Sequence, residues 1–168
     1  MIEKKTIVYL SLGSNMGKRE ENLKRALRLL RGKIIINKVS SFYDTPPVGY
    51  TEQPNFINAV CEAVTSLDPE ELLILIKQIE KDMGRTPNFP NGPRIIDIDI
   101  LIYGKEIIHT NQLTIPHPRM TQRAFVLIPF AEIAPDIIHP ISHNTVHELL
   151  TKSGQTINIK CLSNKISD

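Results

Sequence analysis

The segment 95–103 constrains the fold of this 168-residue chain more than any other. Its isoleucines are β-branched and stiff, and it follows a Gly-Pro turn, so we predict a β-strand. Successive side chains of a strand point to opposite faces, which puts Asp97 and Asp99 on one face and Ile96, Ile98 and Ile100 on the other. The two carboxylates are then expected roughly 6–7 Å apart.

Two carboxylates at this spacing repel each other when both are ionised, unless a cation offsets their charge. Mg²⁺ is the natural partner, because it prefers oxygen ligands and usually reaches proteins together with substrate phosphates. The alternative to a metal site is a half-buried strand whose acidic face is exposed to solvent, and for Asp-x-Asp alone this is the simpler explanation.

Arginines near the two aspartates favour the metal interpretation. Arg85 and Arg94 flank the loop before the strand, and Arg119 and Arg123 follow it. Guanidinium groups bind phosphate oxygens bidentately and stay charged at any relevant pH. Paired carboxylates among arginines suit phosphoryl transfer, in which positioning and charge neutralisation carry most of the catalysis. Solvated surface arginines remain the alternative for each of them singly.

Composition narrows the class of protein. A hydrophobic content of 41% and a charged content of 23% are ordinary for a globular protein, and the length predicts one domain covering residues 1–168. The net charge of +2 does not suggest a nucleic-acid partner. Cys61 and Cys161 lie far apart and outside a Cys-x-x-Cys pattern, which suits a reducing compartment. Without a signal-peptide pattern or a membrane-length apolar run, we expect a cytoplasmic protein without membrane contacts.

Hydrophobic periodicity predicts the elements of the fold. They are strands over 7–12, 34–43, 56–64 and the aspartate segment, and helices over 19–31, 68–83, 119–132 and, more weakly, from about Thr145 with Asn144 as its cap. The order strand, helix, strand, strand, helix, strand predicts an α+β protein with a ferredoxin-like βαββαβ core. We expect an antiparallel sheet with helices packed on one face, followed by the C-terminal helices.

Two further patterns look like functional sites and are weaker. The turn 13–19 resembles a phosphate-binding P-loop, but its spacing is too short and Arg19 replaces the metal-binding Ser or Thr. A tight turn in which Asn15 bonds local backbone is the better interpretation. His139, His143 and His147 recur at every fourth position, but a proline interrupts any helix there, so we do not expect a metal site.

Several segments spread along the chain match one known family. They are Leu12-Gly13-Ser14-Asn15, Ser41-Phe42-Tyr43, Thr45-Pro46-Pro47 with Gly49, Gln53-Pro54, Phe56, Asn58, Glu80, Gly84-Arg85, the run 92–103, Pro116-His117-Pro118, Arg123 and Phe125. With them the chain resembles the 6-hydroxymethyl-7,8-dihydropterin pyrophosphokinases of folate biosynthesis over nearly its whole length. The Gly-Pro-Arg-x-x-Asp-x-Asp run is the most specific of these matches.

The resemblance implies transfer of pyrophosphate from ATP to the hydroxymethyl group of the pterin, giving the pterin diphosphate and AMP. Asp97 and Asp99 would hold two Mg²⁺ ions and, with Arg85 and Arg94, would form the catalytic group. The residues implied at ATP are Glu80, Arg85, Arg94, Ile100, Thr114, His117 and Arg123. Those implied at the pterin are Thr45, Pro46, Val48, Phe56, Asn58, Asp97 and Phe125, with the two phenylalanines stacked on the ring.

The loop 86–91 departs from the family pattern. Many bacterial members carry arginines and a tryptophan there, whereas this loop is shorter, rich in proline and without either residue. Such loops act as lids, so we expect closure here to rely on Phe89. Pro118 and Gln112 also replace a tyrosine and an arginine of some members, which makes the nucleotide affinity less predictable than the chemistry.

Two other functions remain open at this point. A metal-dependent nucleotidyl transferase or phosphohydrolase would use the same paired aspartates on a similar sheet. A non-catalytic ferredoxin-like module would bind a protein or RNA, although no run of aromatic and basic residues supports it. The partners expected from the resemblance are the two small-molecule substrates and other folate-pathway enzymes.

Overall fold

Strand β1 (Thr6–Ser14) is the central strand of the sheet, antiparallel to β4 (Phe56–Thr65) on one side and to β5 (Asp97–Tyr103) on the other. Beyond β4, the sheet continues through β2 (Ile35–Val39) and β3 (Phe42–Thr45), and β8 (Lys160–Leu162) pairs with β3. All of these pairs are antiparallel. The predicted α+β class with an antiparallel sheet is therefore confirmed.

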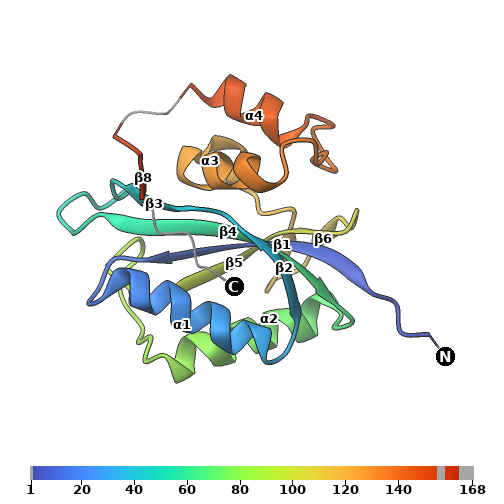
Figure 1. The fold of residues 1–168 in the computed structure, drawn as a ribbon, viewed down its shortest axis with the longest axis horizontal. Helices are drawn as coiled ribbons and strands as arrows, with labels where there is room; N and C mark the ends of the chain where they lie inside the picture. Colours follow the sequence, from blue (N-terminus) through green and yellow to red (C-terminus); the bar gives the residue numbers. More distant parts are fainter. Residues whose placement is uncertain (1, 155–157, 163–168) are drawn as a thin grey trace.

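The structure is a computed structural model that describes residues 2–154 and 158–162. The other elements are α1 (Arg19–Arg31), α2 (Pro69–Asp82), the pair β6 (Ile108–His109) and β7 (Thr114–Ile115), the 3-10 helix η1 (Met120–Gln122), α3 (Ala124–Ile133) and α4 (Val146–Ser153). Figure 1 shows that α1 and α2 lie on one face of the sheet and that α3 and α4 lie on the other. Helices were expected on one face, so the finding extends the prediction: the C-terminal helices cover the second face.

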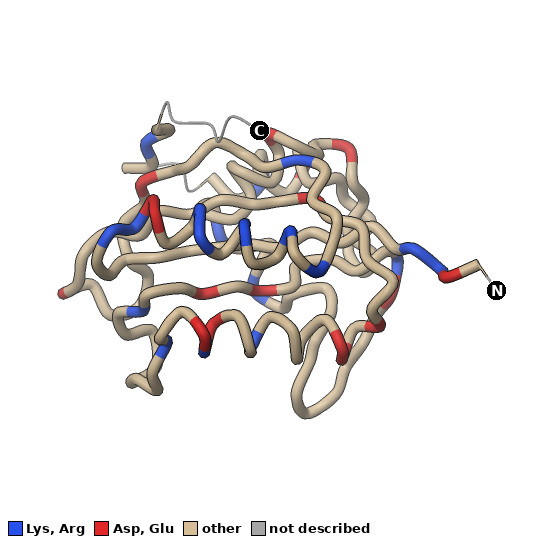
Figure 2. Tube along the Cα trace, turned by 60° about the horizontal axis from the view of Figure 1, so that its bottom comes forward, with Lys and Arg blue, Asp and Glu red and all other residues tan. Residues whose placement is uncertain are grey.

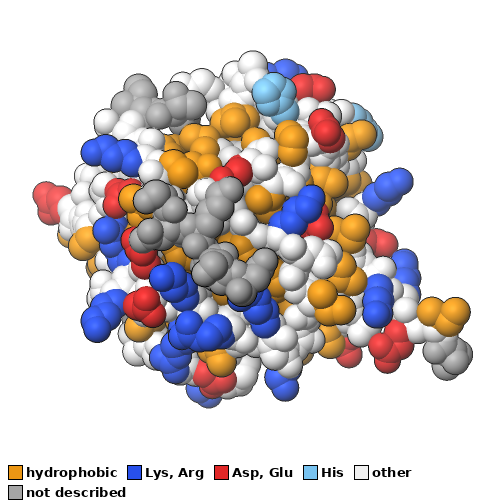
Figure 3. Space-filling view, viewed as in Figure 1, with side chains coloured by type: hydrophobic (Ala, Val, Ile, Leu, Met, Phe, Trp, Pro, Cys, Tyr) orange, Lys and Arg blue, Asp and Glu red, His pale blue; other side chains and the backbone are white. Residues whose placement is uncertain are grey.

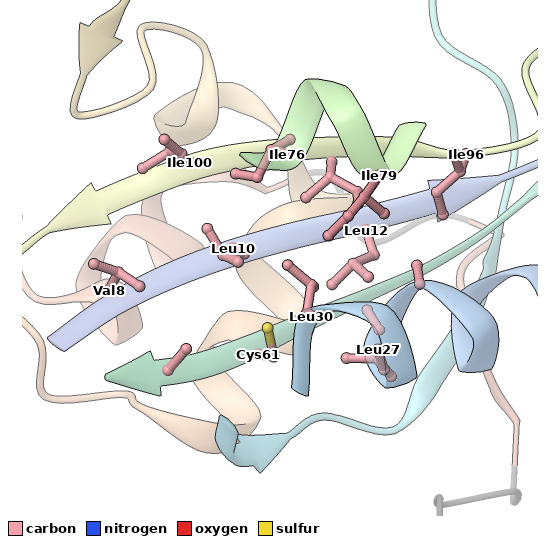
Figure 4. Close-up of a cluster of buried hydrophobic side chains, with 14 of the residues drawn as sticks. Val8, Leu10, Leu12, Leu27, Leu30, Cys61, Ile76, Ile79, Ile96 and Ile100 are labelled. Atoms are coloured by element: carbon pink, nitrogen blue, oxygen red, sulfur yellow. The ribbon is translucent and has the colours of Figure 1, made fainter. Parts of the chain in front are cut away.

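The larger core lies between the sheet and the first two helices (Figure 4). Alternation along β1 points Val8, Leu10 and Leu12 toward this layer, where the buried leucines of α1 and isoleucines of α2 meet them. Fully burying each such side chain stabilises the fold by about 1.5–3 kcal/mol. A second cluster, with Tyr9 and Phe130 at its centre, lies between the opposite face and α3 and α4. Strand β4 is buried on both faces as a result.

The two helices of the first layer begin and end where local chemistry predicts. Helix α1 spans the predicted residues, with glutamates in its first turn and arginines in its last. Helix α2 begins with a capping box, in which Asp68 accepts from the Glu71 N–H and the Glu71 carboxylate accepts from the Asp68 N–H. It ends just before Gly84, whose positive φ of 89° suits a glycine.

Strand ends differ from the predictions by one or two residues, and β1 continues through Gly13 and Ser14, which were expected in a turn. Three further boundaries differ as well. The strand expected over 34–43 is broken at Ser40 and Ser41, because Glu132 of α3 accepts hydrogen bonds from the Ser41 backbone N–H and hydroxyl. The helix expected over 119–132 is interrupted at Arg123, whose backbone is extended with φ −113° and ψ 99°. The cap of α4 is Thr145 rather than Asn144, since the Thr145 hydroxyl accepts from the Glu148 N–H at 3.1 Å.

Charged residues of both signs are distributed along the chain (Figure 2). In the face shown in Figure 3, several basic side chains gather over α1, with acidic ones close by. This mixture agrees with the low net charge of +2 and gives no uniform field over the face in view. Among the described residues, no helix is long and apolar enough to cross a membrane.

Candidate active site

The register of the three central strands brings the predicted site residues together. Gly13 of β1 pairs with Asp97 of β5 on one side and with Asn58 of β4 on the other. Two residues earlier along β1, Ser11 pairs with Asp99 of β5. These residues lie on the face that α3 partly covers, whereas Ile96, Ile98 and Ile100 point into the core of α1 and α2. The predicted alternation along β5 is therefore correct.

A cavity of about 210 Å³ opens on this face of the sheet. It is lined by Ser11, Leu12, Gly13, Thr45, Pro46, Val48, Phe56, Asn58, Asn91, Arg94, Asp97, Asp99, Arg119, Gln122, Arg123 and Phe125. All seven residues that the resemblance implies at the pterin are among them. The break before α3 matters here, because Arg123 lies at the break and Phe125 in the first turn of the helix, and both line the cavity.

Asp97 is held by two arginines. Arg85 Nη1 donates to Asp97 Oδ1 at 2.9 Å, and Arg94 Nε lies 3.2 Å from Asp97 Oδ2. Burial opposes ionisation of Asp97, but the charges of Arg94 and Arg85 outweigh it and lower the pKa of this carboxyl below its ordinary value. The Arg94 guanidinium also lies 4.8 Å from the centre of the Phe56 ring, which links the charged part of the site to the aromatic part.

The pKa of Asp99 is shifted in the opposite direction from that of Asp97. Burial, followed by the neighbouring charge of Asp97, raises the pKa of Asp99 to about 6. A second negative charge at this position is therefore unfavourable in the protein alone, and a cation between the two carboxylates would relieve it. Among the described residues, no cluster of three or more His, Cys, Asp and Glu side chains could hold a metal. The pair thus fits a hard cation whose other ligands are water and phosphate oxygens, as is usual for Mg²⁺.

His117 approaches Asp99 from the loop after β7. Its Nδ1 accepts from the Arg119 N–H at 3.1 Å, so the proton of the neutral ring is on Nε2, the nitrogen 4.0 Å from Asp99 Oδ2. Burial and then the charge of Arg123 lower the pKa of His117 to about 4. Near neutral pH the ring is therefore an uncharged N–H donor at the edge of the site.

A second cavity, of about 450 Å³, lies between α2 and the segment 85–94. Its charged lining residues are Lys77, Lys81, Arg85 and Arg94, with Glu80 as the single carboxylate. Glu80 is buried, and its two oxygens accept from Lys77 at 2.9 Å and from Arg85. Arg85 therefore connects this cavity to Asp97. The net positive lining suits a polyphosphate.

Some predicted residues are not gathered at either cavity. The Ile100 side chain points into the core of α1 and α2 (Figure 4), and Thr114 lies on β7. Neither lines the two cavities described above. His139, in the weaker histidine pattern, is buried, and its Nδ1 accepts from the Ile141 and Ser142 backbone, which is a structural role in a turn.

The hydrogen bonds of Asn15 differ from the prediction. It was expected to bond local backbone, but its amide donates to Gln53 and to the Pro54 carbonyl, and its oxygen accepts from the Arg94 N–H at 2.9 Å. Gln53 in turn donates to the Asn91 carbonyl at 2.7 Å. The turn after β1 thereby holds two distant loops against each other. A contact between side chain and backbone so far apart in sequence leaves no periodic signal.

The structure also adds residues that the sequence did not single out. Lys77 is the counter-ion of buried Glu80 and lowers the pKa of Asp97, and its only sequence signal is the spacing of three residues from Glu80 on a helix. Ser11 lines the cavity beside the aspartates, as does Gly13, which was expected at the start of a turn and among the family matches. Their position follows from strand pairing, which the sequence of β1 does not reveal.

Comparison with known proteins identifies the family. The family model for 7,8-dihydro-6-hydroxymethylpterin-pyrophosphokinase matches residues 9–135. The chain is 50% identical over 133 residues to the 2-amino-4-hydroxy-6-hydroxymethyldihydropteridine pyrophosphokinase of Bacillus subtilis, covering 78% of this chain and 80% of that protein. The protein of the same name from Aquifex aeolicus is 45% identical over 141 residues, covering 84% of this chain and 88% of that protein.

Longer proteins also contain a similar region. A folic acid synthesis protein of Dictyostelium discoideum is 46% identical over 91% of this chain, which spans only 24% of that protein. A crystal structure of Plasmodium falciparum HPPK-DHPS matches with a TM-score of 0.75 at 20% identity, covering 89% of this chain and 46% of that one, and supports the fold. The family model and the two bacterial relatives show that the chain belongs to the 7,8-dihydro-6-hydroxymethylpterin-pyrophosphokinase family, enzymes of folate biosynthesis that transfer pyrophosphate to hydroxymethyldihydropterin.

Proposed function

We propose that this chain performs the family reaction at the cavity beside Asp97 and Asp99, with ATP as the pyrophosphate donor and 6-hydroxymethyl-7,8-dihydropterin as the acceptor. One observation carries the proposal. A single cavity of about 210 Å³ combines the two carboxylates with two phenylalanines and a buried amide. This combination suits a flat, polar heterocycle whose reacting group points at a metal site.

The pterin is proposed to lie between Phe56 and Phe125. Both rings line the cavity, and offset stacking on aromatic rings favours a flat heterocycle. Asn58 and Thr45 supply polar groups for its edge, which must be satisfied once buried. Pro46 and Val48 complete the wall of the cavity.

Asp97 and Asp99 are proposed to hold two Mg²⁺ ions. The raised pKa of Asp99 supports this, because burial and then the charge of Asp97 disfavour its ionised form, and bound cations would offset both effects. When bound, Mg²⁺ supplies charge neutralisation on the triphosphate and fixes its orientation. The number of ions, two, comes from the resemblance.

The nucleotide is proposed to reach the aspartates from the basic cavity between α2 and the segment 85–94. Arg94 lines both cavities, and Arg85 lines the basic one and reaches Asp97, so both can contact phosphate oxygens. His117 and Arg123 lie near Asp99. The donor on His117 Nε2 and the arginine charges would stabilise the negative charge on the transferred group. Glu80 holds Arg85, and Ile100 and Thr114 stay proposed nucleotide neighbours.

Beyond stabilising negative charge, the protein mainly has to align the hydroxymethyl oxygen with the β-phosphorus. The hydroxymethyl oxygen bonds to the β-phosphorus, and the bond from that phosphorus to the oxygen shared with the α-phosphate breaks. AMP leaves with the electron pair of that bond, and the hydroxyl proton passes to solvent. Holding the two reactants in line at the aspartates accounts for a large part of the rate.

We further propose that residues 1–168 act as one domain, since both hydrophobic clusters share the same sheet. A cytoplasmic location stays a prediction. The names of longer relatives, such as the bifunctional folate synthesis protein of Arabidopsis thaliana, support other folate enzymes as partners.

The test is an assay of AMP release from MgATP with and without the reduced pterin, together with detection of the pterin diphosphate. We expect AMP and pterin diphosphate in equal amounts, and none without pterin or after chelation of the metal. AMP or phosphate release that does not need the pterin would favour the nucleotidyl transferase or phosphohydrolase alternative. Absence of any Mg²⁺-dependent nucleotide binding would favour the non-catalytic module.

A further inference from the structure

Gly13 lies where the metal and aromatic parts of the site meet. It pairs in register with Asp97 on one side and with Asn58 on the other, so the three residues form a row across the sheet. All three line the same cavity. A side chain at this position would stand between a carboxylate proposed to bind metal and an amide proposed to bind pterin.

The backbone of β1 does not itself require a glycine here. Gly13 lies within a regular strand, and its φ is outside the positive range that other residues avoid. Glycine in the interior of a strand weakens it by about 0.5–1 kcal/mol relative to alanine. The reason for glycine at this position must therefore be space rather than conformation.

Asn58 occupies the space that a side chain at Gly13 would need. A Cβ built on Gly13 would lie 2.5 Å from Asn58 Oδ1 and 3.6 Å from a carbon of the Phe56 ring. The first distance is far below an ordinary contact between carbon and oxygen, so either the methyl group or the amide would have to move.

Asn58 has little freedom to move. The residue is 9% exposed, and its Nδ2 donates to Thr45 Oγ1 at 2.7 Å. This hydrogen bond fixes the orientation of the amide and turns Oδ1 toward Gly13. Displacing the amide would break the bond in a buried place, where an unpaired polar group is costly.

We propose that Gly13 is a positioning residue of the pterin site, which acts by leaving room for the Asn58 amide to present Oδ1 to the substrate. The inference rests on the proposed function, because it takes the ligand of the cavity to be the pterin. A purely structural glycine would affect stability alone. A positioning glycine affects pterin affinity through Asn58 and leaves the nucleotide site unchanged.

The experiment is a double-mutant cycle between Gly13→Ala and Asn58→Ala. Calorimetry measures the pterin Kd in the presence of Mg²⁺ and a non-hydrolysable ATP analogue, and the Kd of the analogue with Mg²⁺ alone. We expect Gly13→Ala to weaken pterin binding roughly tenfold or more and to leave the Kd of the analogue unchanged. In the Asn58→Ala background, where the clashing oxygen is gone, it should change the pterin Kd by no more than about twofold.

Gly32→Ala is the matched control. Gly32 ends α1 in a right-handed conformation, and a Cβ there would meet its nearest atom at an ordinary 3.4 Å. It should leave both affinities unchanged. Equal losses from Gly13→Ala in the wild-type and Asn58→Ala backgrounds would overturn the inference, as would wild-type pterin affinity in Gly13→Ala or an equal loss of nucleotide affinity.

Melting temperatures of the same variants cover the case in which Gly13→Ala is too unstable to assay. The inference then requires that the double variant regains stability and nucleotide binding relative to Gly13→Ala, and a loss that persists in the double variant would contradict it. A wild-type protein that binds nucleotide but no pterin would instead contradict the proposed function.

Discussion

Arg85 Nη1 donates to Asp97 Oδ1 at 2.9 Å, so this arginine and a metal ion bound at Asp97 would compete for the negative charge of the same carboxylate. The same nitrogen contacts the buried Glu80, which keeps the guanidinium close to the aspartate. In the protein alone, Arg85 thus neutralises part of the charge that Mg²⁺ would neutralise. When metal and nucleotide bind, the guanidinium is already beside the place where phosphate oxygens would arrive.

We predict that Arg85→Met lowers kcat/KM by about 10- to 100-fold, because a hydrogen bond to a charged group contributes about 1.5–3 kcal/mol. The same change should tighten Mg²⁺ binding to the nucleotide-free protein, since a positive charge beside Asp97 is removed. Steady-state kinetics and metal titration measure the two effects. Arg28→Met, on the exposed face of α1, is the control and should change neither. Weaker Mg²⁺ binding in Arg85→Met would contradict the competition.

Removal of either aspartate tests the metal assignment directly. We predict that Asp97→Ala and Asp99→Ala each lower the catalytic rate by about a thousandfold or more, because loss of a metal ion removes several kcal/mol of transition-state stabilisation. The fold should stay intact by circular dichroism. Asp82→Ala, which removes an exposed carboxylate at the end of α2, serves as the control. Near-wild-type activity in either aspartate variant would refute the assignment.

Much of the fold could be predicted because the relevant forces are local. The periodicity of leucines in α1 and the capping residues of α2 gave correct ends for both helices. The break between β2 and β3 could not be predicted, since it depends on Glu132, which lies 91 residues from Ser41 along the chain. The ends of α2 are determined by residues of the helix and its caps. The break between β2 and β3 is determined by a contact that forms only when the chain folds.

The positions of the site residues could likewise be predicted only in part. Strand alternation correctly placed Asp97 and Asp99 on one face of β5, because the repeat of a strand is fixed by its backbone. That Phe56 and Phe125 line one cavity with them follows from the pairing of β4 with β1 and from the docking of α3. Single apolar residues carry no such information, and both rings would pass as core residues by composition alone.

The pH dependence of stability should report the burial of the Asp99 carboxyl and its repulsion from Asp97. The pKa of Asp99 is raised from 3.8 to about 6, so its protonation stabilises the folded metal-free protein. This contribution is complete below the ordinary value and is lost as the pH rises through about 6. The pKa of Asp97 is lowered, so its own contribution is lost only at more acidic pH. Ionised Asp99 therefore destabilises the metal-free protein at neutral pH.

We predict that metal-free Asp99→Asn melts at a higher temperature than wild type near pH 7 and that the difference vanishes near pH 4. The difference between the two proteins is the right quantity, because His117, with its pKa lowered to about 4, changes stability in the opposite direction in both of them. Saturating Mg²⁺ should stabilise wild type more than the variant. A difference that stays constant between these pH values would contradict the raised pKa.

The loop 86–91 should close through Phe89. Phe89 is 51% exposed, and its ring meets Tyr50 edge-on with the ring centres 5.1 Å apart. Tyr50 belongs to the loop that follows Val48 of the pterin cavity, and Gln53 fastens this loop to the Asn91 carbonyl. The two loops therefore touch at a half-exposed aromatic pair, of which Phe89 lines the basic cavity.

We predict that Phe89→Ala lowers turnover and weakens pterin affinity, because the loop loses the contact that holds it over the site. Aromatic pairs contribute about 0.5–1.5 kcal/mol beyond their area, so the two single changes, Phe89→Ala and Tyr50→Ala, should each cost roughly 2- to 12-fold in pterin Kd. The double variant should cost little more than either one, since both remove the same contact. Ile74→Ala, which removes a more exposed apolar side chain on α2, should change nothing. Unchanged turnover and pterin affinity in Phe89→Ala would show that the loop closes without its ring.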